Sequence, residues 1–230
     1  MIKYKKKLID LSLHLYRQSL IFRDFGNLSI RFNKELLIKA SGRPMSNLSE
    51  NDLVNVELKS GNYYSKLKPS SDTATHIEIY NAFEEINGVV HSHSLYATAW
   101  AQSGNPIPCL GTTHADYWNG QIPITRELKD QEIDGDYEKE TGKVIIEKIN
   151  ELNLSPLYCP GILVANHGPF TWGATIEDAV KNAEIMEYVA KLAWLSHSIN
   201  QNAEPISPSL LKKHFFRKHG SDAYYGQDSD

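Results

Sequence analysis

Two histidines separated by a single serine follow a short apolar run, in the segment Val89-Val90-His91-Ser92-His93. Because side chains alternate along a β-strand, residues two positions apart point to the same side. His91 and His93 are therefore expected to project together, about 7 Å apart along the strand. Imidazole nitrogens bind transition metals, so such a pair makes half of a metal site. The alternative is that each histidine only satisfies hydrogen bonds.

A third histidine, His167, stands at the end of another apolar run, residues 161–168, which we interpret as a buried strand. Functional residues of α/β folds gather at the ends of strands. Three histidines and one open position form a typical catalytic metal site. Asp72 is a candidate fourth oxygen ligand or a nearby base. Its alternative role is to cap the helix that begins beside it.

Small residues that allow backbone amides to approach an anion occur in three places. Ser70 and Ser71 precede a predicted helix, whose free N–H groups and dipole favour a phosphate. Lys39 lies close to one of the other turns and supplies positive charge. The alternative for the serines is simple helix capping. The candidate phosphate-binding residues are Gly26, Asn27, Lys39, Ser41, Gly42, Ser70 and Ser71.

Asp116 and the tyrosine pair Tyr224-Tyr225 are candidates for proton transfer. Aspartate and tyrosine act as general acids or bases where the site shifts their pKa values. The sequence around Asp116 and around the tyrosine pair contains no motif that indicates such a role. The tyrosines lie in a polar tail, where the alternative is that they pack against a neighbouring subunit.

The elements that must position these residues follow from periodicity and turn signals. One domain over residues 1–230 is expected, with helices on the faces of a mainly antiparallel sheet, because short turns join the early strands. Residues 130–137 are expected to form an acidic loop. We predict a helix that starts within residues 68–76 and runs to about residue 85, and further helices at 3–21, 94–103, 138–151, 175–199 and 210–218. Strands are predicted at 28–32, 35–39, 52–58, 89–93 and 161–168.

The composition is that of an ordinary globular protein, with 41% hydrophobic residues among 230. A net charge of −4 offers no basic surface for nucleic acid. The N-terminal segment is basic and then apolar, but charged residues interrupt it, so an amphipathic helix is favoured over a signal peptide. No apolar run approaches a membrane span. We expect a cytoplasmic protein in which Cys109 and Cys159 are reduced thiols.

Five motifs, taken together, resemble the class II aldolase/adducin-like family. They are GNLS at 26–29, SG at 41–42, PSSDTATH at 69–76, VVHSHS at 89–94 and ANHG at 165–168, and their order is kept along nearly the whole chain. The resemblance implies an α/β fold, a three-layer α/β/α sandwich with a central, mainly antiparallel sheet. It also implies a cyclic homotetramer that binds one Zn²⁺ per subunit and a sugar phosphate, with sites at the subunit interfaces.

The resemblance assigns roles to the candidate residues. It places Zn²⁺ on His91, His93 and His167, with Asp72 beside or on the metal. It gives the substrate phosphate to the two Ser-containing turns, at Ser41-Gly42 and Ser70-Ser71, with Asn27 and Lys39 nearby. It makes Asp116 and Tyr225 an acid/base pair across a subunit interface.

Within the family, the segments 111–117, 132–145 and 212–227 are similar to members that interconvert L-ribulose 5-phosphate and D-xylulose 5-phosphate. The C4–H bond is not acidic, so inversion there implies cleavage of C3–C4 and re-addition to the other face of the aldehyde. An aldolase of the fuculose-1-phosphate type is the alternative, but such aldolases are expected to carry a longer Glu where this chain has Asp72. A non-catalytic adducin-like interaction domain would be expected to lack the metal ligands. Arg43, after the Ser-Gly pair, departs from the expected pattern.

Overall fold

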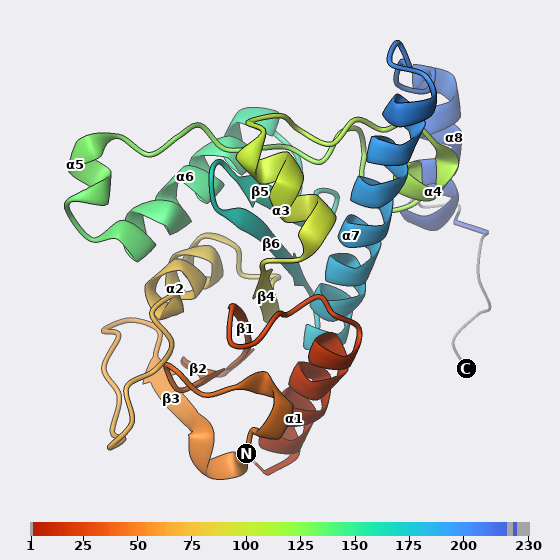
Figure 1. The fold of residues 1–230 in the computed structure, drawn as a ribbon. Coiled ribbons are helices and arrows are strands. Elements are labelled where there is room, and N and C mark those ends of the chain that lie inside the picture. Colours follow the sequence, from red (N-terminus) through yellow and green to blue (C-terminus); the bar gives the residue numbers. More distant parts are fainter. Residues whose placement is uncertain (1, 220–222, 225–230) are drawn as a thin grey trace.

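The computed structural model describes residues 2–219 and 223–224 (Figure 1). Its elements match most of the predicted ranges within a few residues. In chain order they are α1 (Ile2–Arg17), β1 (Gly26–Phe32), β2 (Glu35–Lys39), η1 (Met45–Asn47), η2 (Glu50–Asp52), β3 (Leu53–Glu57), α2 (Thr73–Ala82), β4 (Gly88–Ser92), α3 (Leu95–Gln102), α4 (Thr112–Ala115), α5 (Asp130–Ile133), α6 (Tyr137–Leu152), β5 (Gly161–Val164), β6 (Gly168–Gly173), α7 (Ile176–Ile199) and α8 (Pro208–His219).

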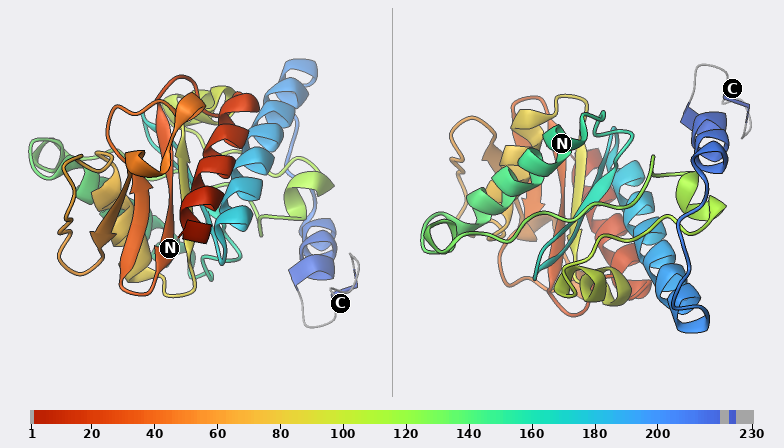
Figure 2. Two further views of the ribbon diagram at one scale, coloured as in Figure 1. Left: turned by 90° about the horizontal axis from the view of Figure 1, so that it is seen from below. Right: turned by 90° about the horizontal axis from the view of Figure 1, so that it is seen from above.

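The strands form a six-stranded sheet in the order β3-β2-β1-β4-β6-β5. Every neighbouring pair is antiparallel. Figure 2 shows α1 and α7 against one face of this sheet and α2 and α6 against the other. The three-layer α/β/α arrangement with a central antiparallel sheet is therefore confirmed.

Alternating residues of β1 explain why both faces of the sheet are covered. Leu28 and Ile30 join the apolar cluster that also contains Leu8 of α1 and Val180 of α7. Residues of the other parity face α2, and Ser29 among them is fully buried. β1 therefore alternates apolar and polar side chains although both of its faces are covered, and its polar side chains lie on the side of α2.

The segment around His167 is a correction to the prediction. A single strand over residues 161–168 was expected, but β5 ends at Val164 and β6 begins at Gly168. The turn between them contains Asn166 in the left-handed conformation, with φ of 60°. Asparagine tolerates this conformation better than most residues, which allows the chain to reverse within three residues. His167 thus lies in a hairpin turn and not in a strand.

Two further boundaries differ from the expected ones. The strand that carries the first histidine ends at Ser92, so His93 lies just beyond it. The expected acidic loop at 130–137 contains the short helix α5, and the carboxylate of Glu132 in this helix accepts a 2.8 Å hydrogen bond from the backbone N–H of Lys129. None of the helices in the described part of the chain is long and apolar enough to cross a membrane.

Candidate functional site

The three histidines converge although they come from separate segments. His91 is on β4, His93 follows the end of that strand, and His167 is in the turn between β5 and β6. One ring nitrogen from each lies within 4.8 Å of the others. The Nε2 atoms of His91 and His93 are 3.1 Å apart. The structure therefore confirms that these three side chains meet at one point.

The hydrogen bonds of the cluster fit a metal ion. The Nδ1–H of His91 donates to the backbone oxygen of Pro169 at 3.0 Å, which leaves the Nε2 lone pair directed into the cluster. The Nδ1 of His167 is buried without a hydrogen-bond partner among the described residues. Burial lowers the pKa of His91 well below its usual value, and it lowers those of His93 and His167 as well. Neutral imidazoles are the form that ligates a metal.

Asp72 lies next to this cluster at the N-cap position of α2. Its side chain makes no capping hydrogen bond to the helix. The Oδ2 atom instead accepts a 2.5 Å hydrogen bond from Nδ2 of Asn27 on β1. The carboxylate is not part of the three-residue group of clustered ligand atoms. The capping alternative thus finds no support, and direct metal ligation by Asp72 stays a prediction.

A cavity of about 270 Å³ joins the histidines to the candidate phosphate-binding residues. All seven of the latter line it, together with Asp72 and the three histidines. Two residues that the motifs did not single out, Asp24 and Phe25, complete the wall. The lining residues are Asp24, Phe25, Gly26, Asn27, Lys39, Ser41, Gly42, Ser70, Ser71, Asp72, His91, His93 and His167.

The positive charge in this cavity comes from Lys39. Its side chain is buried, and Nζ donates to the backbone oxygen of Arg43 at 3.2 Å. Burial lowers the pKa of Lys39, while the charges of Asp24 and Asp72 oppose that shift. The departure at Arg43 has a local explanation, because its Nε pairs with Oδ1 of Asp52 at 3.1 Å. Arg43 thus offers its backbone to the lysine and its guanidinium to Asp52.

Gly26 is required by the close approach of β1 to the histidine strand. Its φ is +123°, a conformation that L side chains rarely adopt. A Cβ atom built there would lie 2.6 Å from the backbone oxygen of His91. Any larger residue would push β1 away from His91, so the glycine of the GNLS motif has a structural reason.

Asp116 is held in a different part of the chain. Its carboxylate accepts hydrogen bonds from Arg217 at 2.8 and 3.1 Å and from His214 at 3.0 Å, both on α8. Burial acts to raise the pKa of Asp116, but these hydrogen bonds and the charge of Lys218 lower it overall. Figure 1 shows α4, which Asp116 follows, beside α8 and away from β1 and α2. Asp116 is therefore not brought to the histidine cavity of its own chain.

Tyr225, the other predicted acid/base residue, lies outside the described residues. Its neighbour Tyr224 is exposed, and Nζ of Lys213 lies 5.1 Å from the centre of its ring. The backbone N–H of Tyr224 donates to the oxygen of Arg217 at 3.0 Å. The segment just before Tyr225 therefore contacts the same helix that holds Asp116.

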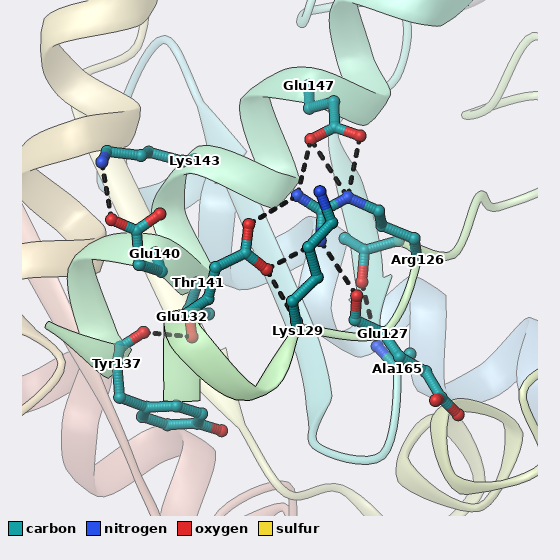
Figure 3. Close-up of polar contacts among 11 residues, drawn as sticks. Arg126, Glu127, Lys129, Glu132, Tyr137, Glu140, Thr141, Lys143, Glu147 and Ala165 are labelled. Carbon is teal, nitrogen blue, oxygen red and sulfur yellow. Dashed lines mark hydrogen bonds and ion pairs between the residues drawn. The ribbon is translucent and has the colours of Figure 1, made fainter. Parts of the chain in front are cut away.

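Tyr137 is a neighbour of the site that the sequence analysis did not name as a candidate, although it lies in the segment 132–145. It is the first residue of α6, and its ring centre lies 6.3 Å from that of His167. Figure 3 shows how the loop before it is fixed: Arg126 pairs through two 2.8 Å hydrogen bonds with Glu132 and also binds Glu147 of α6. Tyr137 has no distinctive spacing in the sequence, so only the three-dimensional arrangement identifies it.

Comparisons with known proteins agree with this geometry. The family described as the class II aldolase and adducin N-terminal domain matches residues 6–194. The chain is 47% identical to the L-ribulose-5-phosphate 4-epimerase UlaF of Salmonella paratyphi A, over 99% of this chain and 100% of the relative. It is 48% identical to the protein of the same name from Salmonella paratyphi C, with the same coverage.

Solved structures resemble the fold at lower identity. An L-fuculose 1-phosphate aldolase superposes with a TM-score of 0.76 at 22% identity, covering 92% of this chain and 94% of the other. The L-fuculose-1-phosphate aldolase of Thermus thermophilus has a TM-score of 0.70 at 21% identity, covering 88% of this chain and 100% of the other. These likenesses support the fold alone.

Proposed function

The chain belongs to the class II aldolase and adducin family, and we propose that it is a zinc-dependent L-ribulose-5-phosphate 4-epimerase. It would interconvert L-ribulose 5-phosphate and D-xylulose 5-phosphate by inversion at C4. The observation that carries this proposal is the single cavity that joins three clustered histidines to a lysine- and serine-lined anion site. The 47% sequence identity between this chain and a curated epimerase, over nearly the full length of both, supports the assignment of the substrate.

Zinc is the metal that fits three neutral histidines with an open position. Bound to His91, His93 and His167, with Asp72 beside it, it would act as a Lewis acid that stabilises negative charge on the ketose oxygens during C3–C4 cleavage. The presence of all three histidines argues against a non-catalytic interaction domain, which would be expected to lack them.

The anion site has the task of keeping the cleaved fragment in place. Lys39, with the hydroxyls of Ser41, Ser70 and Ser71, would hold the phosphate of the glycolaldehyde phosphate that cleavage produces. The aldehyde at the other end can then rotate and present its second face. A firm hold on the phosphate prevents release of the aldehyde, which would turn the epimerase into an aldolase.

Proton transfer at the C4 oxygen needs one group for each face of the aldehyde. We assign Asp116 and Tyr225 to this task, and because Asp116 is held against α8 we assign them to the site of a neighbouring subunit. A homotetramer is proposed on this basis. The C-terminal half of α7 supports association, since Tyr188, Trp194 and Ile199 expose 56%, 52% and 88% of their surface.

The test is to incubate the zinc-loaded protein with L-ribulose 5-phosphate and to assay D-xylulose 5-phosphate. We expect conversion that depends on the metal and is lost with a chelator. Absence of that product together with cleavage of L-fuculose 1-phosphate would contradict the epimerase assignment and favour the aldolase.

A further inference from the structure

One face of β1 is polar along its whole length, although it is packed against α2. Asn27, Ser29 and Arg31 alternate along the strand and therefore point to the same side. Asn27 and Ser29 are buried. Burying polar groups in a core costs free energy unless each one is hydrogen-bonded. The hydrogen-bond partners of these side chains therefore indicate which element this face of β1 holds in place.

At the centre of the face, Ser29 binds two residues of α2. Its Oγ lies 2.7 Å from Nδ1 of His76 and 2.8 Å from the hydroxyl of Tyr80. The Tyr80 hydroxyl also donates to the backbone oxygen of Ser29 at 2.9 Å. All three side chains are fully buried. A single serine thus ties two successive turns of the helix to the strand.

The two ends of α2 are tied to the same strand. At its C-terminal end, the guanidinium of Arg31 donates to the backbone oxygens of Tyr80 at 2.7 Å and of Phe83 at 3.0 Å. At its N-terminal end, Nδ2 of Asn27 donates to Asp72 and, at 3.1 Å, to Oγ of Ser70. The helix is therefore fixed along its length to one strand.

The same strand and helix also border the histidine cluster. Asn27 is the direct partner of His91 in the β1–β4 ladder. The ring of His76 meets Phe170 edge-on at 6.2 Å, and Phe170 stacks on His91 at 4.1 Å. A shift of α2 along β1 would therefore change the distance between Asp72 and the histidines.

We propose that Ser29 and His76 are positioning residues that fix the register of α2 on β1, so that Asp72 and the Ser70-Ser71 turn stand at a set distance from the histidine cluster. Neither residue lines the cavity that contains the histidines. This positioning role rests on the proposed function, because the reaction it would serve is the proposed epimerisation. The N-terminus of α2 lacks a side-chain cap, so the hold on its functional residues comes from the strand beside it.

The test replaces Ser29 by alanine in the full-length, zinc-loaded protein. We expect KM for L-ribulose 5-phosphate to rise roughly tenfold, a smaller effect than the roughly hundredfold that a misplacement of about 1 Å can cost. Calorimetric titration with glycolaldehyde phosphate should show a Kd weakened by a similar factor. Zinc content should stay unchanged, because the three ligands do not depend on α2 for their backbone.

The matched control is Thr171→Val, which deletes another buried hydroxyl between a strand and a helix. Oγ1 of Thr171 donates to the backbone oxygen of Ala179 on α7 at 2.9 Å, on the opposite face of the sheet. This variant should lower the melting temperature while KM and the Kd for glycolaldehyde phosphate stay at the parent values. Equal KM and Kd in Ser29→Ala and Thr171→Val would overturn the positioning role.

A second variant keeps the test decisive if Ser29→Ala does not fold. Tyr80→Phe removes only the hydroxyl that meets Ser29, and it should weaken glycolaldehyde phosphate binding in the same direction by a smaller factor. Unchanged binding in Tyr80→Phe would count against the proposal. If the parent protein does not convert L-ribulose 5-phosphate, the proposed function fails, while the phosphate titration still decides whether Ser29 sets the register.

Discussion

The Nε2 atoms of His91 and His93 face each other at 3.1 Å, although the two residues lie on either side of the end of β4. Two neutral imidazoles whose lone pairs point at one another repel unless a proton or a cation stands between them. The 3.0 Å hydrogen bond from Nδ1–H of His91 to Pro169 leaves Nε2 of His91 as an acceptor, which can take either the Nε2–H of His93 or a metal ion bound by both rings.

Replacing His93 by asparagine should remove metal and activity together. Loss of an outer partner of a ligating histidine costs roughly 10–100-fold in metal affinity, and loss of a ligand should cost more. Metal analysis of the purified variant, combined with the epimerase assay, checks this. His197→Asn on α7 is the control and should retain both. A His93→Asn protein with full activity would remove the metal from the mechanism.

Asp72→Asn should separate the metal from the chemistry. The Asp72 carboxylate is outside the group of clustered histidine nitrogens but is bound to Asn27 at 2.5 Å. We therefore expect zinc content near that of the parent and a kcat lower by roughly a hundredfold, the order of effect of losing an acid/base group. Metal analysis distinguishes the cases: a loss of zinc as large as in His93→Asn would make Asp72 a ligand.

Lys39→Gln should weaken substrate binding through the phosphate. Hydrogen bonds to charged groups contribute about 1.5–3 kcal/mol, which corresponds to a rise in KM of roughly ten- to hundredfold. Lys34→Gln, at an exposed position in the turn between β1 and β2, is the matched control and should leave KM unchanged. Steady-state kinetics with both variants measure the difference. An unchanged KM in Lys39→Gln would indicate that the substrate phosphate binds elsewhere in the cavity.

The sequence predicted the parts of the site that depend on local pattern. The His91–His93 pair and the Ser70-Ser71 turn could be identified because spacing and helix starts are local properties. The hydrogen bonds between β1 and α2 could not be predicted, because the alternation of Leu28 and Ile30 indicates a strand but does not show what packs against the side that carries Ser29. In a sheet covered on both faces, odd- and even-numbered residues of a strand are both buried. Only the packing of α2 shows which of its residues form hydrogen bonds with the polar side chains of β1.

Long-range geometry limited the rest of the prediction. The position of His167 in a turn depends on the left-handed Asn166, and the predicted strand ended at residue 168, where β6 in fact begins. Pro169 has no N–H to donate, yet it is paired with Leu163 in the ladder between β5 and β6. The separation of Asp116 from the histidines followed from no motif, since it depends on where α8 packs.

His114 should make the protein less stable in acid. Burial lowers its pKa to about 4, whereas an unfolded chain keeps the ordinary value of about 6.5. Between these values the unfolded state binds more protons, so the free energy of unfolding falls as pH falls, by up to about 1.4 kcal/mol per pH unit for this residue.

Urea titrations of metal-free protein from pH 6.5 to 4 measure that slope. His114→Gln cannot take up the proton and should show a slope smaller by the contribution of one group. Identical slopes for the parent protein and His114→Gln would mean that folding does not change the pKa of His114.

Mixing two inactive variants should restore activity if each site is built from two subunits. His93→Asn destroys the metal site, and Asp116→Asn destroys the acid/base group that α8 holds away from the histidines of its own chain. In a mixed oligomer with heterologous contacts, an active site needs an intact histidine cluster from one subunit and an intact Asp116 from its neighbour. Random mixing of equal amounts of the two variants gives this combination at about a quarter of the sites. Activity should therefore appear on unfolding the two proteins together and refolding them, and be absent when each is refolded alone. A mixture that stays inactive, although mass spectrometry shows mixed oligomers, would place Asp116 in the site of its own chain and require α8 to move.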